Sequence, residues 1–210
     1  MKLSERPLAF VDVETTGLDA TRHEIIEVAV VFDTSAVIRA DASWANHLTI
    51  EGDIAYWTTL VKPERIEDAE PFALKINGYA DKPQDWAYAP SAAWVSDILR
   101  ELVTREGANP VLVGHNVSFD RDFISNMLLR EGFTQHVAHN VVDTGALAYE
   151  HLVPCGLESL SLDAVRRSLG MPTDGAHRAL QDAKDARTVY HRLSRATSFD
   201  RALWKFRKRK

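Results

Sequence analysis

The stretch "LAFVDVETTG", residues 8–17, decides the fold, because it has the pattern of a buried β-strand that carries two acids. Successive side chains of a strand face opposite sides, so Asp12 and Glu14 share one face. Both faces are otherwise apolar, which is typical of a strand inside a helix-covered sheet, where ligands bind at the carboxyl ends of strands. Salt bridges are the ordinary explanation for such acids, but no Lys or Arg follows Arg6 nearby. Unpaired buried carboxylates cost several kcal/mol, and a bound divalent cation would offset that cost.

The rest of the chain alternates strand and helix patterns. Five segments are expected to form strands, namely residues 7–14, 24–33, 55–61, "PVLVGHN" at 110–116 and "HNVVDT" at 139–144. Helical periodicity begins near residue 91 and surrounds the last two strands, so the fold class is α/β. The segment 34–54 fits either a long hairpin or an insertion. No linker divides the chain, and we expect one domain over residues 1–197 and a separate basic tail over 198–210.

A third carboxylate points inward from a predicted helix, "HNVSFDRDFISNMLLREG", residues 115–132. With the helix starting near Ser118, Asp120 falls in the middle of the apolar stripe, whereas Asp122 falls on the opposite side. Acids in the first turn of a helix are favoured by the helix dipole. That preference does not account for the position of Asp120 on the core-facing side.

A fourth carboxylate lies in "GAHRALQDAKDARTVYHRL", residues 175–193. Asp182 lies inside the apolar stripe of this predicted helix, and Asp185 lies at its margin. His177 can approach Asp182 only if it precedes the helix, for which "DGAH" is a suitable loop. A lone histidine is more often a surface or satisfied core residue, but this one stands beside an inward-facing acid.

The four inward-facing acids have a joint explanation as a metal site. Oxygen ligands without cysteine, HxH or HExxH patterns favour Mg²⁺ or Mn²⁺ over Zn²⁺. Acidic clusters that hold two such cations serve phosphodiester chemistry, in which one ion activates water and the other stabilises the leaving oxygen. A nearby histidine then acts as the general base.

These motifs resemble those of the DEDDh family of 3′-to-5′ exonucleases, which includes proofreading subunits of replicative DNA polymerases. The family's three motifs are similar to "FVDVETTGL", "HNVSFD" and "HRALQD" here, in the same order and with a spacing of five from histidine to aspartate. The resemblance covers about residues 7–195. It implies a ribonuclease H-like fold with a five-stranded mixed sheet flanked by helices.

The resemblance also implies roles for individual residues. Asp12, Glu14 and Asp182 would hold the ion that binds the attacking water, Asp12 would bridge to a second ion supported by Asp120, and His177 would deprotonate the nucleophile. The residues implied in substrate binding are Thr15, Thr16, Gly17, Leu18 as a wedge, Asn116 and Phe119.

Two features depart from the family pattern. Segment 34–54 is longer than the family's usual turn between early strands, and "INGY" at 76–79 replaces a more usual version that contains histidine. Neither removes a catalytic group.

Composition limits the partners. No apolar run is long enough to span a bilayer and the amino terminus lacks a signal pattern, so we expect a soluble, cytoplasmic protein without a membrane partner. The only cysteine, Cys155, has no partner for a disulfide or a cysteine metal cluster. The net charge is −5, and the last ten residues carry six of the 25 basic residues and no acid, so the other 200 residues carry −11. This basic tail fits phosphate contact, docking to a partner such as a polymerase, or plain solvation.

The sequence therefore predicts a metal-dependent 3′-to-5′ exonuclease that acts on a single-stranded 3′ end, with DNA favoured, and releases nucleoside 5′-monophosphates. The candidate protein partner is a DNA polymerase or another replication or repair protein. The alternatives are an RNA-trimming or oligoribonucleotide-degrading enzyme on the same scaffold, and a relative that binds nucleic acid without turnover.

Overall fold

The computed structural model describes residues 2–40, 43–104, 107–134, 137–173, 177–197, 200 and 204. Of the predicted basic tail, residues 198–210, the described residues include only Asp200 and Trp204. Most of the tail therefore lies outside the described residues, and its boundary at 197 stays a prediction. Trp204 is buried in a cluster with side chains of the two helices at Thr144–Leu152 (α5) and Leu162–Leu169 (α6). No helix in the described part of the chain is long and apolar enough to cross a membrane.

A six-stranded mixed sheet forms the centre of the protein, in the order β3-β4-β2-β1-β5-β6. The strands are β1 Leu8–Thr15, β2 Ile25–Asp33, β3 Thr49–Glu51, β4 Ile54–Leu60, β5 Val111–Gly114 and β6 Val141–Asp143. Strands β1 and β5, and β5 and β6, pair in parallel, and the remaining neighbours pair antiparallel. All five expected strands are present, and the mixed sheet is confirmed.

The expected number of strands was one too few. The additional strand, β3, comes from segment 34–54, which also holds α1 Thr34–Ala40 and a short 3₁₀-helix, Ser43–His47. The segment was expected to be either a long hairpin or an insertion, and it has features of both. Strands β3 and β4 form a hairpin, and the inserted helix α1 precedes it. All three residues of β3 are exposed, so this edge strand lacks the apolar alternation that identifies a strand in a sequence.

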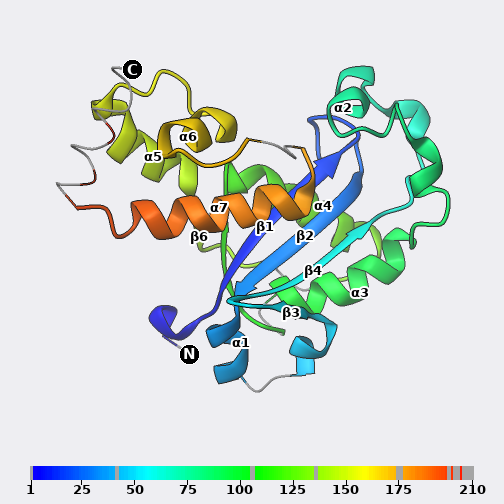
Figure 1. Ribbon diagram of the computed structural model, residues 1–210. Helices are drawn as coiled ribbons and strands as arrows, with labels where there is room; N and C mark the ends of the chain where they lie inside the picture. Colours follow the sequence, from blue (N-terminus) through cyan, green and yellow to red (C-terminus); the bar gives the residue numbers. More distant parts are fainter. Residues whose placement is uncertain are drawn as a thin grey trace.

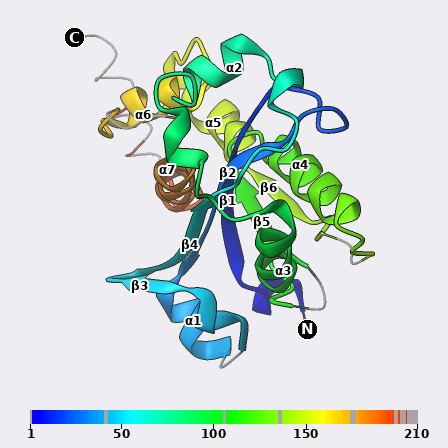
Figure 2. The same cartoon turned by 90° about the vertical axis from the view of Figure 1, so that its right-hand side faces the viewer.

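Helices cover both faces of the sheet. Besides α1, the described α-helices are α2 Pro71–Ile76, α3 Ala92–Val103, α4 Val117–Arg130, α5 Thr144–Leu152, α6 Leu162–Leu169 and α7 Ala179–Leu193. Figure 2 shows α7 on one side of the sheet and α3 and α4 on the other. Phe10 packs in the cluster beneath α7, whereas Ala9 and Val11 pack in the larger cluster with α3 and α4. The alternation of β1 is therefore as predicted, and its two faces belong to different helix layers.

The carboxyl end of β1 points toward α2 at one end of the molecule (Figure 1). Helix α2 is attached there at both of its ends. The backbone N–H of Glu70 donates to the carbonyl of Thr16 at 2.7 Å, and the Asn77 side chain donates to the carbonyl of Thr15 at 3.0 Å. The fold thus encloses the end of β1 between α2, α4 and the start of α7.

Candidate active site

Asp12 and Glu14 lie side by side near the carboxyl end of β1, on the face that meets α7. Glu14 stands opposite Glu27 of β2, and a register shift follows directly between Glu14 and Thr15. Burial raises the pKa of Glu14 to about 8, reinforced by the charges of Asp182, Glu27 and Asp120. Burial, with the neighbouring acids, also raises the pKa of Asp12 well above its usual range. Arg178 opposes the rise for Glu14, but its effect is smaller than that of burial and the neighbouring acids.

Asp120 is contributed by the first turn of α4 and is buried, as its helical phase predicted. Its Oδ1 accepts the backbone N–H of Val13 at 3.0 Å, which fixes it against β1. Burial raises its pKa to about 7 in spite of that hydrogen bond. Asp122 is exposed and pairs with Arg121 at 2.8 Å, so the predicted separation of the two acids is confirmed.

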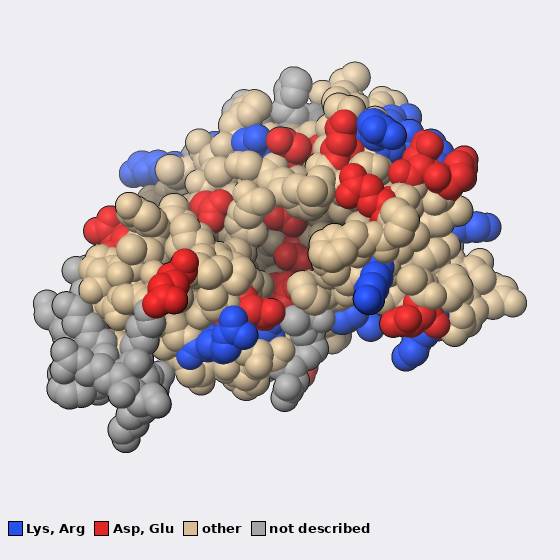
Figure 3. Space-filling view, turned by 90° about the horizontal axis from the view of Figure 1, so that it is seen from above, with Lys and Arg blue, Asp and Glu red and all other residues tan. Residues whose placement is uncertain are grey.

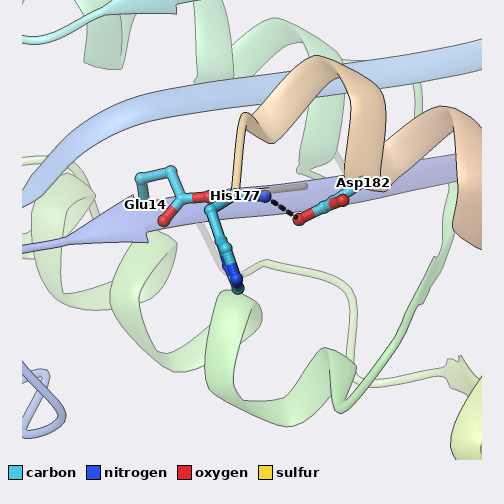
Figure 4. Close-up of side chains that lie close together, drawn as sticks. All are labelled: Glu14, His177 and Asp182. Atoms are coloured by element: carbon cyan, nitrogen blue, oxygen red, sulfur yellow. Dashed lines mark hydrogen bonds between the residues drawn. The ribbon is translucent and has the colours of Figure 1, made fainter. Parts of the chain in front are cut away.

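Asp182 and His177 come together at the start of α7. The helix begins at Ala179, so His177 precedes it as expected; residues 174–176 of the predicted loop lie outside the described residues. The backbone N–H of His177 donates to Oδ2 of Asp182 at 3.0 Å (Figure 4). One potential ligand atom from each of Glu14, His177 and Asp182 lies within 4.8 Å of the others. The structure therefore gathers ligand-type groups from two distant parts of the chain.

His177 has a left-handed backbone, with a φ of 63°. This conformation is uncommon for residues other than glycine, although histidine adopts it more readily than most. Its side chain is exposed. A left-handed residue next to a helix start changes the chain direction sharply, and strained backbone of this kind clusters at functional sites.

Asp185 was placed at the margin of the apolar stripe, but it is buried, and it meets Arg166 of α6. The Nη2 atom of Arg166 lies 2.9 Å from Oδ2 of Asp185, and Nη1 lies 3.4 Å from Oδ1 of Asp182. Burial raises the pKa of both acids, and Arg166 opposes that rise. Asp182 is therefore partly balanced by a salt bridge. The sequence offered a signal for Arg166, because it shares a helix face with Leu162, Val165 and Leu169.

Glu27 is a further buried acid that the sequence reasoning did not single out. It is 3% exposed on β2, and its Oε2 lies 3.0 Å from Nε of Arg178, the residue after His177. Burial raises its pKa, and Arg178 opposes this. A lone acid inside the apolar run "IIEVAVVF" was the available signal. The Glu27–Arg178 pair ties the His177 segment to the sheet.

The last residue of β1 and the turn after it hold the predicted substrate residues Thr15 to Leu18. The backbone N–H of Thr16 donates to the carbonyl of Glu24, and its Oγ1 accepts the Glu24 N–H, each at 2.9 Å. A Cβ at Gly17 would overlap the buried ring of His23, so only glycine fits there. Leu18 is 75% exposed beyond this fixed turn. An exposed apolar side chain on rigid backbone suits the expected wedge.

Asn77 lies in "INGY", the segment that departs from the family's more usual version with histidine. It is 4% exposed, donates to the carbonyl of Thr15, and accepts the backbone N–H of Tyr79 at 3.2 Å. In this chain, the Asn77 side chain therefore fastens α2 to the turn.

Asn116 and Phe119 lie at the start of α4, close in sequence to Asp120. Asn116 is left-handed, with a φ of 66°, and its backbone N–H donates to Oδ1 of Asp143 at 3.3 Å. Phe119 packs on Phe123 with ring centroids 4.7 Å apart. Their contact with a substrate stays a prediction.

Viewed from above, the end of the sheet is hollowed, and Asp and Glu side chains gather at the bottom of the hollow (Figure 3). Asp12 and Glu14 are half-buried, so solvent can reach the acidic cluster. An acidic pocket of this kind attracts cations, and it repels a polyanion unless cations are bound.

Comparison with known proteins gives a consistent result. The family model RNase_T, described as "Exonuclease", matches residues 9–190. The chain is 33% identical over 179 residues to the DNA polymerase III subunit epsilon of Treponema pallidum, covering 82% of this chain and 69% of that protein. It is 26% identical over 191 residues to the ribonuclease T of Klebsiella pneumoniae, covering 86% and 80%.

Among solved structures, an E. coli exonuclease I in complex with single-stranded DNA matches with a TM-score of 0.66 and 20% identity. The match covers 95% of this chain and 43% of that chain. A PolC-type DNA polymerase III of Clostridium perfringens is 29% identical, and the match covers only 10% of its length. The structural likeness confirms the expected ribonuclease H-like fold.

Proposed function

Because the chain belongs to the RNase_T exonuclease family, as the DEDDh resemblance predicted, we propose that it is a metal-dependent 3′-to-5′ exonuclease. Its substrate would be a single-stranded 3′ end, with DNA favoured, and its products nucleoside 5′-monophosphates. The observation that carries the proposal is the convergence of Glu14, His177 and Asp182, with their ligand-type atoms within 4.8 Å, beside the half-buried Asp12 and the buried Asp120.

The residues present fit two divalent cations, Mg²⁺ or Mn²⁺. The donors are mainly carboxylate oxygens, which hard cations prefer. Burial and mutual repulsion raise the pKa of Asp12 and Glu14, so the cluster lacks positive charge that a cation would supply. Asp12, Glu14 and Asp182 would hold one ion, and Asp12 with Asp120 would hold the other. When bound, such ions activate water and stabilise the leaving oxygen of a phosphodiester.

The chain's own residues would perform the remaining tasks. His177, exposed at the mouth of the site, would accept the proton of the attacking water, as general bases do when they lie within hydrogen-bond reach. The turn from Thr15 to Gly17 would receive the terminal nucleotide, with Leu18 wedged beside its base. Asn116 and Phe119 would complete the nucleotide pocket from α4.

DNA is favoured as substrate because relatives include subunits of DNA polymerase III, and a polymerase is the corresponding candidate partner. An RNA-trimming enzyme is the second candidate function, supported by the similarity to ribonuclease T over 80% of that protein. A non-catalytic relative is disfavoured, because such relatives usually lack one of the carboxylates, and all four are present here.

The test uses the full chain with 5′-labelled strands in Mg²⁺ and in Mn²⁺. Long single-stranded DNA, tailed RNA and dinucleotides are compared, so that polarity and substrate class are read together. We expect a ladder that shortens from the 3′ end, with DNA degraded fastest. Intact DNA and RNA in both metals would refute the proposal, and faster degradation of tailed RNA or dinucleotides would select the RNA alternative.

A further inference from the structure

Arg166 is among the largest fully buried side chains, at 1% exposure on α6, and it belongs to none of the three family motifs. We propose that it is a positioning residue, which holds Asp182 in the orientation that binds the cation. The inference rests on the proposed function, and it concerns the carboxylate that α7 supplies to the first ion.

The guanidinium of Arg166 is fixed by several partners at once. Its Nε donates to the carbonyl of Pro172 at 3.2 Å, and Nη1 donates to Oδ1 of Asp163 at 3.2 Å. Its Nη2 pairs with Asp185 at 2.9 Å. A planar fork held on three sides cannot rotate freely. The position of Nη1, 3.4 Å from Oδ1 of Asp182, is therefore set by the surrounding protein.

The same contacts restrain both ends of the segment that carries His177. Pro172 lies before that segment and Asp182 at its end, so the Arg166 side chain links the two ends. The other oxygen of Asp182, Oδ2, accepts the backbone N–H of His177. Both oxygens of Asp182 are thus held, one by Arg166 and one by the His177 segment itself.

This arrangement differs from that of the acids on β1. Asp12 lies within the regular sheet pairing of β1 and Glu14 at its end, whereas Asp182 stands in the first turn of a helix that follows a left-handed residue. Carboxylates that ligate metals are commonly oriented by hydrogen bonds from residues behind them, and loss of such a partner lowers metal affinity about 10- to 100-fold. Among the hydrogen bonds of the described residues, the side-chain donor to Asp182 is Arg166.

Arg166 also joins α6 to α7 through Asp185, so a purely structural role must be separated from positioning. Replacing Arg166 alone would leave Asp185 buried and unpaired, which is costly. The double variant Arg166→Met/Asp185→Asn removes both charges of that pair, and Arg166→Lys keeps the charge without the fork. Asp163→Asn is the matched control, because Asp163 contacts the same guanidinium from its partly exposed side.

The experiment measures Mn²⁺ affinity of the full-length variants by the electron paramagnetic resonance signal of free Mn²⁺, with thermal unfolding in EDTA as the folding check. We expect about 10- to 100-fold weaker binding in the double variant, an intermediate loss in Arg166→Lys, and unchanged affinity in Asp163→Asn. A double variant that folds and binds Mn²⁺ with wild-type affinity would overturn the inference. If the double variant does not fold, the same result in a folded Arg166→Lys protein would overturn it. Wild-type protein that binds no Mn²⁺ would instead overturn the proposed function.

Discussion

The two ends of strand β2 and helix α7 hold acids in opposite electrostatic settings. At the far end, Asp33 meets Arg187 at 2.6 Å and His191 at 3.2 Å, both from α7. The same Arg187 pairs with Asp53 at 2.7 Å and lowers the pKa of that carboxyl. At the site end, Glu14 lies on the neighbouring strand β1, opposite Glu27 of β2, and its pKa is raised to about 8. The same helix therefore supplies cations at one end and a further acid at the other.

The charge imbalance at the site is therefore local. At the far end, basic residues of α7 pair with the acids. In the site region, the basic residues that pair with acids, within the described part of the chain, are Arg166 and Arg178. Burial accordingly still raises the pKa of Asp182 and Glu27, although each has a basic partner. A bound cation, as in the proposed function, would supply the remaining positive charge.

The largest expected effect comes from neutralising one acid at each end. Asp12→Asn should lower the hydrolysis rate by about 10³-fold or more, because it removes a metal ligand without changing the side-chain size. Asp33→Asn, the matched control, should retain activity within a few-fold and lose about 1–3 kcal/mol of unfolding free energy, since Arg187 loses a charged partner. Single-turnover rates and urea unfolding measure the two quantities. Similar activity losses in both variants would contradict the distinction between the ends.

The two histidines near α7 provide the next comparison. His177→Ala should reduce turnover by roughly 10²- to 10⁴-fold, as expected for loss of a general base. His191→Ala, at the charge-balanced end, should leave turnover nearly unchanged. Mn²⁺ binding should survive the first substitution, and a large loss of Mn²⁺ affinity would assign His177 as a ligand instead of a base.

Helical phase and strand alternation were sufficient to predict the inward-facing acids. Asp120 and Asp182 are buried because each replaces an apolar residue in a periodic stripe, and periodicity is visible in a single sequence. Pairing between distant elements is not visible in that way. The contacts Arg166–Asp182 and Arg178–Glu27 span 16 and 151 positions, so their discovery required the tertiary arrangement.

The strand count failed for a related reason. Strand β3 has three exposed residues and depends on pairing with β4, which its own composition does not indicate. Asp185 was underestimated because helical phase locates a face but does not say which neighbour covers it; here α6 does, through Arg166.

The pH dependence of stability should be a smaller effect. The pKa values of Glu14 and Asp120 are raised to about 8 and about 7, so the folded metal-free protein holds protons that the unfolded chain releases above about pH 4. Stability in EDTA should therefore fall by roughly a few kcal/mol as the pH rises from about 5 to about 8. Urea unfolding at the two pH values measures this, and Asp12→Asn should flatten the slope. Stability that rises over this range in wild type would contradict the raised values.

The smallest effect concerns the basic tail. Removal of residues 205–210 leaves the buried Trp204 in place and deletes five basic residues. If these residues bind phosphates, the slope of log affinity against log salt for single-stranded DNA should decrease by about 0.7 for each phosphate that the shortened chain no longer neutralises. Fluorescence anisotropy at several salt concentrations, with the inactive Asp12→Asn protein as background, measures the slope. An unchanged slope would exclude the tail from substrate binding.

The most direct test of the central claim is the thermal unfolding temperature at about pH 8 of wild type and Asp12→Asn, first in EDTA and then in Mn²⁺. The unpaired carboxylates predict a crossing: Asp12→Asn should be the more stable protein in EDTA, because it relieves repulsion, and wild type should become the more stable one in Mn²⁺, because it binds the cation. An Asp12→Asn protein that is less stable in EDTA, or a wild type that does not respond to Mn²⁺, would contradict the account.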